Sequence, residues 1–486
     1  MKSYIKLFMP FVIGIAVFLF PMPEGVSLNT WIYFSIFIGV IVGLILEPIP
    51  AALIGFIGIT LAVLFRVGPV GSGDKSVSAS TAINWALSGF SNATVWLIFA
   101  AFMIGIGYQN SGLGRRIALF LVKKLGRSTI GLGYAIAITD GILAPFIPSN
   151  AARSGGTLFP IITSIPPMFG SYPNKDSRKI GAYLAWCALA TTCVSSSIFL
   201  TGQAPNPLAL EVAAKSGVAV VDWGGWLIAF LPVSIILFIA TPLLAYIVYP
   251  PEIKGSNQVV DWAAAEIEKI GKISLKEIYM ISISICALVL WIGSDSFGVN
   301  ATTTAIMVII AMIACKIISW GDFLSNKPAW NVLVWFGTLV TMAAGLKNVG
   351  FLDFVVKITG GYLAGFSPMS AMIGLVLIFY FIHYFFASGT AHVTALLGVF
   401  IVMASSIPGV DASLATLLMV LPMGIMGVLT PYGTGHSPVW FASGYIKTAD
   451  FWRLGCIFGV FYILVYLLVG VPWIVNFAQH WITWVK

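Results

Sequence analysis

Two short polar clusters interrupt stretches of the chain that are otherwise apolar. The first occupies residues 149–153 (SNAAR) and the second residues 388–392 (SGTAH). Each cluster combines hydroxyl or amide groups with a basic residue, Arg153 or His392, placed four positions after its serine. Hydroxyls and amides hydrogen-bond anions, and arginine or protonated histidine attracts them. The two clusters are therefore predicted to form one site for an anion.

The stretches around both clusters are apolar enough to lie in a membrane. Hydrophobic residues make up 59% of the chain and charged residues only 9%, which is far from the balance of a soluble domain. Ionisable groups at membrane depth are costly and usually face a cavity or a partner. We predict an all-α polytopic membrane protein, embedded in a lipid bilayer, with about eleven transmembrane helices and two re-entrant hairpins.

Lysine and arginine residues indicate the orientation of the predicted spans. With the N-terminus in the cytoplasm, alternation of the spans places three basic segments on the same side, at 115–127, 175–179 and 254–276. Basic residues are enriched on the cytoplasmic side of membranes. The formal net charge of +8 therefore reflects topology, and no nucleic-acid partner is expected. The prediction is a multi-pass protein of the cell membrane with a cytoplasmic N-terminus.

An internal repeat relates the two clusters. Residues 107–113 (GYQNSGL) match residues 345–351 (GLKNVGF), and nearly the same offset pairs Arg153 with His392. The segment after the first match is rich in basic residues, whereas the segment after the second is not. Opposite charge bias in matching segments is expected of two halves with inverted topology.

The repeat divides the chain into four segments. We expect an N-terminal span at 1–29, a first inverted repeat at 30–250, a cytoplasmic linker at 251–276 and a second inverted repeat at 277–486. Each cluster is predicted at the tip of a hairpin of two short apolar arms, at 130–167 and 370–407. The arm after each tip presents free N–H groups and the positive end of a helix dipole. Two facing tips would suit a molecule with a carboxylate at each end.

Two further breaks follow the hairpins. Residues 201–207 (TGQAPNP) and 430–438 (TPYGTGHSP) interrupt apolar helices with glycine, proline and small polar residues. Unwound backbone at membrane depth must be buried in protein or line water, and its polar groups can bind a substrate or a cation. The alternative is that both segments are ordinary loops at helix ends. Their occurrence in matching places favours binding.

Four motifs, in this order along the chain, resemble those of the divalent anion:sodium symporter (DASS) family. They are residues 148–153 (PSNAAR), 204–207 (APNP), 387–392 (ASGTAH) and 429–435 (LTPYGTG). The basic residue after each serine is most similar to the branch that includes bacterial citrate/succinate and tartrate/succinate antiporters and plastid oxoglutarate/malate translocators. The resemblance implies a homodimer whose protomers have a scaffold domain and a transport domain that moves by an elevator mechanism.

The resemblance also implies that the substrate lies between the two hairpin tips. Ser149 and Asn150 would bind one carboxylate, and Ser388 with Thr390 the other. The chain departs from the Ser-Asn-Thr pattern of the family at both tips, where Ala151 lacks a hydroxyl and Gly389 lacks an amide. The expected substrate-binding residues are Ser149, Asn150, Ala151, Pro205, Asn206, Ser388, Gly389, Thr390, Thr434 and Gly435.

Fixed positive charge favours obligatory exchange over sodium-coupled transport. Bound Na⁺ can leave a carrier, whereas Arg153 cannot leave and stays protonated. An empty carrier would move this charge through a low-dielectric barrier, at a cost of about several kcal/mol. We therefore expect antiport of C4 or C5 dicarboxylates such as succinate, malate, fumarate or 2-oxoglutarate, with Arg153 and His392 compensating the charge of the substrate. A Na⁺-coupled di- or tricarboxylate symporter is the alternative function.

Each basic residue also has a structural interpretation. Arg153 would form an ion pair with Asp140 of the same hairpin, and His392 would be a neutral histidine in the core. His436 either approaches the substrate or caps the following helix. Packing or interfacial roles are expected for His383 and His480.

An enzyme is the weakest of the functional classes. It would need a nucleophile with a base, or a set of metal ligands. The histidines lack H-x-x-x-H spacing, and the five cysteines lie inside apolar stretches without close pairing. We expect neither a metal nor a cofactor.

Overall fold

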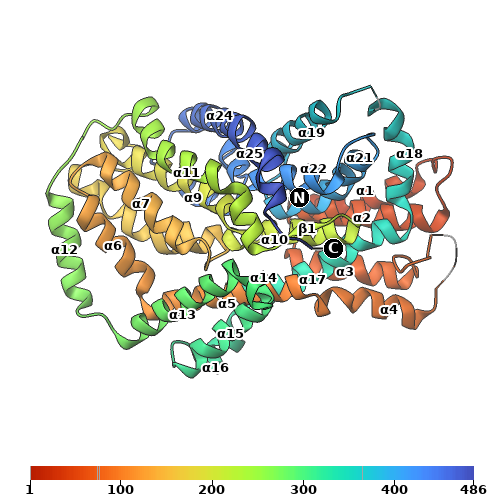
Figure 1. Ribbon diagram of the computed structural model, residues 1–486, viewed down its shortest axis with the longest axis horizontal. Helices are drawn as coiled ribbons and strands as arrows, with labels where there is room; N and C mark the ends of the chain where they lie inside the picture. The colour runs from red at the N-terminus through yellow and green to blue at the C-terminus, as the bar shows by residue number, and fades with distance from the viewer. Residues whose placement is uncertain (1, 74, 76, 364, 486) are drawn as a thin grey trace.

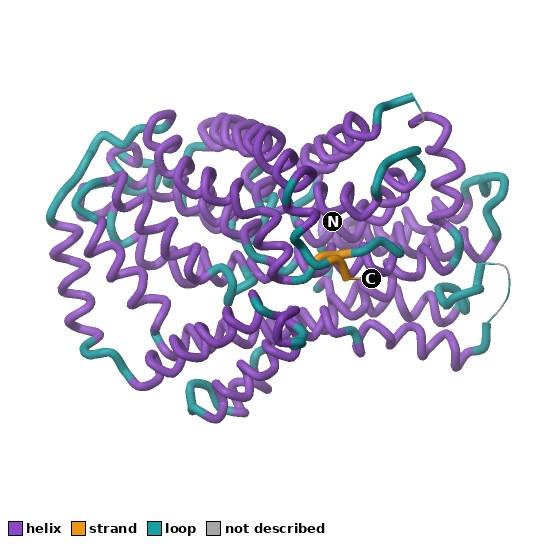
Figure 2. Tube along the Cα trace, in the orientation of Figure 1, coloured by secondary structure: helices purple, strands orange, loops and turns teal. Residues whose placement is uncertain are grey.

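The residues described by the computed structural model are mostly helical (Figures 1 and 2). One short antiparallel sheet pairs β1 (Val220–Val221) with β2 (Trp484–Val485) and holds the C-terminal end of the chain near the middle of the molecule. The all-α prediction is confirmed. The described residues are 2–73, 75, 77–363 and 365–485.

Four helices precede the first segment of the internal match. Serine side chains cap two of them: Ser27 accepts a hydrogen bond from the N–H of Thr30, and Ser78 accepts one from the N–H of Thr81. The first three helices pack in sequence, each against the next. The bounds are α1 (Lys2–Leu19), α2 (Leu28–Leu46), α3 (Ala51–Leu64) and α4 (Ala79–Leu87).

The next seven α-helices carry the first cluster and the first break. They end in a long helix that contains two prolines and stays continuous. The bounds are α5 (Ala93–Ser111), α6 (Leu113–Leu125), α7 (Thr129–Leu143), α8 (Phe159–Thr163), α9 (Gly181–Ile198), α10 (Pro205–Ser216) and α11 (Trp223–Val248).

The segment predicted as a cytoplasmic linker is also helical. The predicted linker at 251–276 contains a helix, α12, in which apolar and polar positions alternate with helical periodicity. Figure 1 shows α12 at one end of the long axis of the molecule. The bounds in this region are α12 (Gln258–Ile270), α13 (Leu275–Ile292), α14 (Ser294–Phe297), α15 (Ala301–Ala314) and α16 (Trp320–Ser325).

The remaining helices carry the second cluster and the second break. Short 3₁₀ and π-helical segments connect several of them, so that long apolar stretches are divided into short helices. The bounds are α17 (Lys327–Asn348), α18 (Phe351–Leu363), α19 (Pro368–Ile382), α20 (Gly389–His392), α21 (Gly398–Ser405), α22 (Ala412–Val420), α23 (Ser437–Ala442), α24 (Thr448–Val465) and α25 (Val471–Asn476).

Similar elements surround the two matching sequence segments, 107–113 and 345–351. In both halves a long helix, a left-handed glycine and an amphipathic helix precede the hairpin. The glycines are Gly112, between α5 and α6, and Gly350, between α17 and α18, with φ angles of 76° and 78°. Glycine is favoured there because a Cβ would clash in the left-handed conformation. The segments 115–127 and 353–365 that follow are therefore mainly helices rather than loops.

Many helices suit a membrane by length and composition. Among the described residues, eight helical stretches are long and apolar enough to cross a bilayer, and six shorter apolar helices accompany them. One of the eight, α9, is buried along its entire length. It packs against α7 and α11 and so occupies the centre of the larger hydrophobic core. A second core is built mainly by α2, α3 and α17.

Candidate functional site

The first polar cluster lies where the chain turns back after α7. Residues 147–149 are not helical, and the returning arm begins with a π-helical segment, Ala151–Leu158. Ser149 accepts a hydrogen bond at 3.2 Å from a backbone N–H three residues later, which satisfies one of the free donors at a helix start. Asn150 is buried, and Ala151 is exposed.

The second polar cluster lies at the corresponding turn after α19. Residues 386–388 are not helical, and α20 starts the returning arm, followed by a π-helical segment, Val393–Leu397. Ser388 and Gly389 are partly exposed, and Thr390 is buried. Both returning arms thus contain π-helical winding, which is frequent at functional sites because it re-aims side chains.

The first break separates α9 from α10 at residues 199–204. The side chain of Asn206 spans it, donating to the carbonyl oxygens of Ser196 at 2.8 Å and Phe199 at 3.0 Å. The carbonyl oxygen of Phe199 also accepts from the N–H of Gly202 at 2.8 Å, so the end of α9 is held from both sides. Gln203 donates to Oδ1 of Asn206 at 2.8 Å. The side-chain amide of Asn206 is therefore already hydrogen-bonded within the break. Gln203 was not among the site residues predicted from the sequence.

Each hairpin tip contacts the break of the other half. Asn150 of the first tip donates to Oγ1 of Thr434 in the second break at 3.0 Å. A Cβ built on Gly389 of the second tip would lie 3.1 Å from Cγ of Pro205 in the first break. Asn150 also lies 3.4 Å from Oε1 of Gln203. Tips and breaks therefore form one connected site.

Ala151 and Gly435, two of the residues predicted from the sequence, also approach each other in this region. A Cβ built on Gly435 would lie 3.6 Å from Cβ of Ala151, and both residues are exposed. Side chains that are only partly buried can still meet a solute from solution. The partly exposed members of the site are Ser149, Pro205, Ser388, Gly389 and Thr434.

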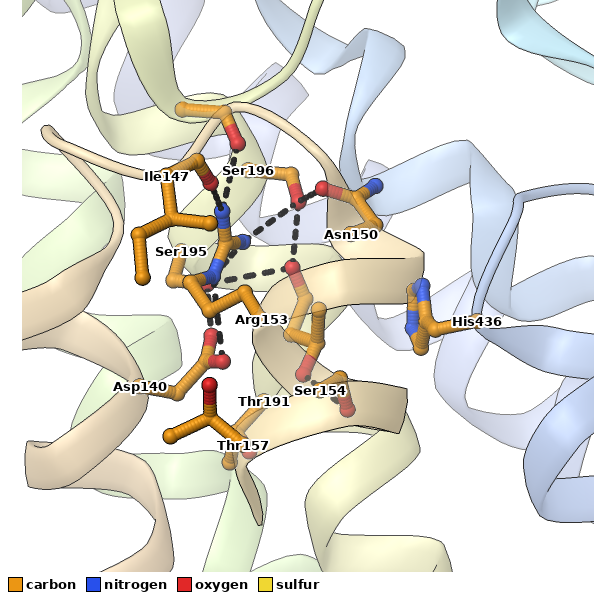
Figure 3. A network of polar contacts seen from close by, with 12 residues as sticks. Asp140, Ile147, Asn150, Arg153, Ser154, Thr157, Thr191, Ser195, Ser196 and His436 are labelled. Carbon is orange, nitrogen blue, oxygen red and sulfur yellow. Dashed lines mark hydrogen bonds and ion pairs between the residues drawn. The ribbon is translucent and has the colours of Figure 1, made fainter. Parts of the chain in front are cut away.

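Arg153 lies behind the first tip in a dense polar network (Figure 3). Its side chain and that of Asp140 are both 0% exposed, and Nε of the arginine lies 3.1 Å from Oδ1 of the aspartate. A guanidinium has five N–H donors, and all five find an acceptor. The other four reach the carbonyl oxygens of Ile147 at 2.6 Å and Gly202 at 2.7 Å and the hydroxyls of Ser195 and Ser196, both at 3.1 Å.

This network bears on the role of Arg153, for which charge compensation and an ion pair with Asp140 were the two interpretations. The structural alternative, an ion pair with Asp140, is what the structure contains. The arginine has no donor left for a substrate, and its charge is cancelled within the protein. Its guanidinium is linked to the first tip by Ser196, whose hydroxyl lies 2.6 Å from the carbonyl oxygen of Thr192 and 3.0 Å from Oδ1 of Asn150. Three consecutive serines, residues 195–197, lie at the end of α9, and two of them, Ser195 and Ser196, are partners of Arg153. This run of serines is the sequence feature from which these partners could have been predicted.

His392 is fully buried, and another histidine faces it. Nδ1 of His383 and Nδ1 of His392 are 3.2 Å apart, and Nε2 of His383 donates to the carbonyl oxygen of Gly433 at 2.8 Å. A packing or interfacial role was expected for His383. Its position could have signalled the contact, since His383 comes five positions before Ser388 on one arm and His392 comes four positions after it on the other.

His436 packs against α9 beside the second break. Its Nε2 donates to the carbonyl oxygen of Leu189 at 3.0 Å, and its Nδ1 is 3.5 Å from Oγ1 of Thr434. The side chain does not cap α23, so the capping alternative is wrong. His480 is exposed near the C-terminal end and lies outside the site.

A cavity of 530 Å³ lies beside the returning arm of the first hairpin. Thr157 of that arm and Trp262 and Glu266 of α12 contribute to its lining. A hydrogen bond from Lys269, reinforced by Arg115, holds the pKa of the Glu266 carboxyl below its usual range. The ion pair with Arg115 connects α12 to α6 next to the hairpin.

The known proteins that this chain resembles in sequence are named as membrane transporters. The family profile described as "Sodium:sulfate symporter transmembrane region" matches residues 1–478. The L-tartrate/succinate antiporter of Escherichia coli O157:H7 is 43% identical over 461 residues, which cover 94% of each chain. The citrate/succinate antiporter of Escherichia coli strain K12 is 46% identical over 476 residues, covering 96% of this chain and 97% of that one.

Among solved structures, the YdaH transporter of Alcanivorax borkumensis has a similar fold. The TM-score is 0.57 at 12% sequence identity, and the match covers 88% of this chain and 98% of that chain. At this identity the likeness concerns the fold alone. The family profile and the sequence relatives identify the protein as a membrane transporter rather than an enzyme.

Proposed function

The chain belongs to the divalent anion:sodium symporter family, and on that premise we propose that it exchanges dicarboxylates across the cell membrane. One observation carries this proposal: each hairpin tip contacts the helix break of the other half, through Asn150 with Thr434 and Gly389 with Pro205. Hydroxyl, amide and backbone N–H groups of both tips thus belong to one site. A dicarboxylate presents an anionic group at each end and suits such a pair of tips.

The substrate class is a C4 or C5 dicarboxylate such as succinate, malate, fumarate or 2-oxoglutarate. Ser149 of the first tip and Ser388 of the second are exposed enough to donate to carboxylate oxygens. Two relatives are named for exchange of succinate against tartrate or citrate. Ala151 and Gly389 reduce the number of side-chain donors, so backbone N–H groups at the start of each returning arm supply part of the binding.

Charge compensation in the proposed exchanger centres on His392. The charge of Arg153 is cancelled by Asp140, so Arg153 positions the first tip, whereas His392 has no carboxylate partner among the described residues. A proton on His392 would offset part of the negative charge of a bound dicarboxylate. The neutral pair of Arg153 and Asp140 favours a second candidate function, Na⁺-coupled symport, because it leaves the empty first tip without net charge.

The proposed mechanism is an elevator movement in a homodimer with a cytoplasmic N-terminus. Most helices around the site belong to the larger core, whereas Phe386 and Ala391 at the second tip pack in the second core with α2, α3 and α17. This division suits a transport domain that moves against a scaffold. The proposed topology has about eleven spans, two re-entrant hairpins and inverted repeats at 30–250 and 277–486.

Uptake of labelled succinate and 2-oxoglutarate into proteoliposomes tests this proposal. Vesicles are empty or preloaded with unlabelled dicarboxylate, and each set is assayed with and without a Na⁺ gradient. The exchanger should accumulate label only in preloaded vesicles and should be indifferent to Na⁺. Na⁺-driven uptake into empty vesicles would assign the chain to the symport class instead.

A further inference from the structure

His383 and His392 form a contact that limits how many protons they can hold. Their Nδ1 atoms are 3.2 Å apart, and their rings stack with centroids 5.2 Å apart. Nε2 of His383 faces the carbonyl oxygen of Gly433 at 2.8 Å. A carbonyl only accepts hydrogen bonds, so this nitrogen carries a proton.

The remaining protons follow from the chemistry of imidazole. A neutral His383 that is protonated on Nε2 has a lone pair on Nδ1, which accepts from Nδ1–H of His392. In this arrangement Nε2 of His392 has no proton. A second proton cannot enter the contact between the two Nδ1 atoms, since two N–H groups would then point at each other. Only Nε2 of His392 is open to protonation.

That open nitrogen is buried without a partner. Nε2 of His392 has no hydrogen-bond partner among the described residues, and such an atom is costly to leave unsatisfied. The ring lies between Phe379 and Phe386, with centroid distances of 4.2 and 5.0 Å. Aromatic faces attract cations. The surroundings of His392 can therefore support a positive charge on this ring.

The ring of His392 is close along the chain to the second tip. The backbone N–H of His392 donates to the carbonyl oxygen of Ser388 at 3.1 Å, so His392 lies in the first turn of the returning arm. A positive charge there acts on an anion at the tip through a medium of low dielectric, where attraction is stronger than in water. The same turn presents the free N–H groups of the helix start.

We propose that His383 and His392 act as a pair that takes up one proton together with a dicarboxylate bound at the second tip. The proton comes from solvent and binds Nε2 of His392, and the charge of the pair changes from zero to plus one. His383 is a positioning residue that fixes the tautomer of His392. This inference rests on the proposed function and adds one coupled proton, held by one defined nitrogen.

Other titratable groups on neighbouring elements have partners of their own. Glu211 and Lys215 on α10 lie 3.6 Å apart, and the hydroxyls of the nearby tyrosines donate to backbone carbonyls. These tyrosines are Tyr33 on α2, Tyr380 on α19 and Tyr432 in the second break, whose acceptors are the carbonyl oxygens of Met342, Gly459 and Tyr384. His436 donates to the carbonyl oxygen of Leu189. The histidine pair is therefore the group on these elements best placed to gain a proton.

Proton uptake by the unaltered protein is the first test. Purified protein in weakly buffered detergent solution receives succinate, and a pH indicator reports protons taken up while calorimetry reports succinate bound. We expect proton uptake to approach one proton per bound succinate once the pH is high enough that the histidine pair of the substrate-free protein is neutral. Binding without proton uptake across the pH range would overturn the proposal and leave dicarboxylate exchange intact. Absence of binding and exchange of every dicarboxylate would instead contradict the proposed function.

Two variants test the roles of His392 and His383, and a third serves as the control. His392→Gln removes the open nitrogen, His383→Gln keeps a donor for Gly433 but loses the ring nitrogen that faces His392, and His480→Gln is a matched control at an exposed histidine outside the site. Succinate exchange is measured from acid to alkaline pH for each. Size-exclusion chromatography verifies that each variant is folded.

The expected profiles differ in slope and midpoint. Exchange by the unaltered protein and by His480→Gln should fall with rising pH along a curve for one proton, and His392→Gln should be slow and independent of pH. His383→Gln should shift the midpoint toward acid pH by about one unit, a tenfold loss of proton affinity, because protonated His392 loses its charge-assisted acceptor. A two-proton slope, or a His383→Gln profile that overlays that of the unaltered protein, would contradict the pair. If His383→Gln fails to fold, the proton count of the unaltered protein decides.

Discussion

At the scale of single residues, Arg153 and Asp140 show how a buried charge is stabilised by its partners. Removing one member of a buried ion pair costs about 3–5 kcal/mol, because the other charge stays unpaired. Arg153→Ala should therefore lower the thermal stability strongly and abolish exchange, since Ser196 and Asn150 lose their anchor. Asp140→Ala together with Arg153→Ala should recover part of the stability but no exchange. Unfolding followed by tryptophan fluorescence in detergent measures the first effect.

The matched control for the ion pair is Arg115→Ala. Arg115 is exposed and pairs with Glu266 at 2.9 Å, and exposed pairs contribute only about 0–1 kcal/mol. Its removal should leave stability nearly unchanged. A double variant of Arg153 and Asp140 that is no more stable than Arg153→Ala would show that the unpaired charge is not the cause of the loss.

At the scale of elements, the second hairpin depends on close contact between its tip and α10. Gly389→Ala would place a Cβ 3.1 Å from Cγ of Pro205, which is closer than ordinary packing, so the tip or α10 must shift. We expect at least about a tenfold slower exchange, equivalent to about 1.4 kcal/mol. Gly398→Ala on the same arm meets no atom within 4 Å and should exchange normally. Equal rates for both variants would argue against a role for this contact.

At the scale of the whole molecule, α6 and α18 occupy equivalent places in the two proposed repeats. The side of the membrane on which each helix lies therefore tests the proposed topology. Inverted repeats place them on opposite sides of the membrane. In a cysteine-free background, Lys123→Cys on α6 should react with an impermeant maleimide only from the cytoplasmic side, and Lys357→Cys on α18 only from outside. Both lysines are exposed, so their replacements should be reachable. Labelling of both from the same side would refute the inverted topology.

The sequence determined by itself the features that depend on local chemistry. Apolar stretches predicted membrane helices, the polar residues 149–153 and 388–392 marked the two turns, and proline and glycine marked the breaks, because hydropathy and backbone preference act within a few residues. Asp140 was identified as a possible partner of Arg153 for the same reason, since both belong to one hairpin.

Tertiary structure decided the contacts between elements distant in the sequence. Ser195, Ser196 and the carbonyl oxygen of Gly202 complete the shell of Arg153 because α9 ends beside the first hairpin. Asn150 meets Thr434 because each tip packs on the opposite half. Whether a buried basic residue is a free charge or a neutralised anchor depends on such partners, and residue type alone does not specify them. That is why the sequence located the site but only the folded chain revealed that Arg153 is neutralised and that His392 faces a second histidine.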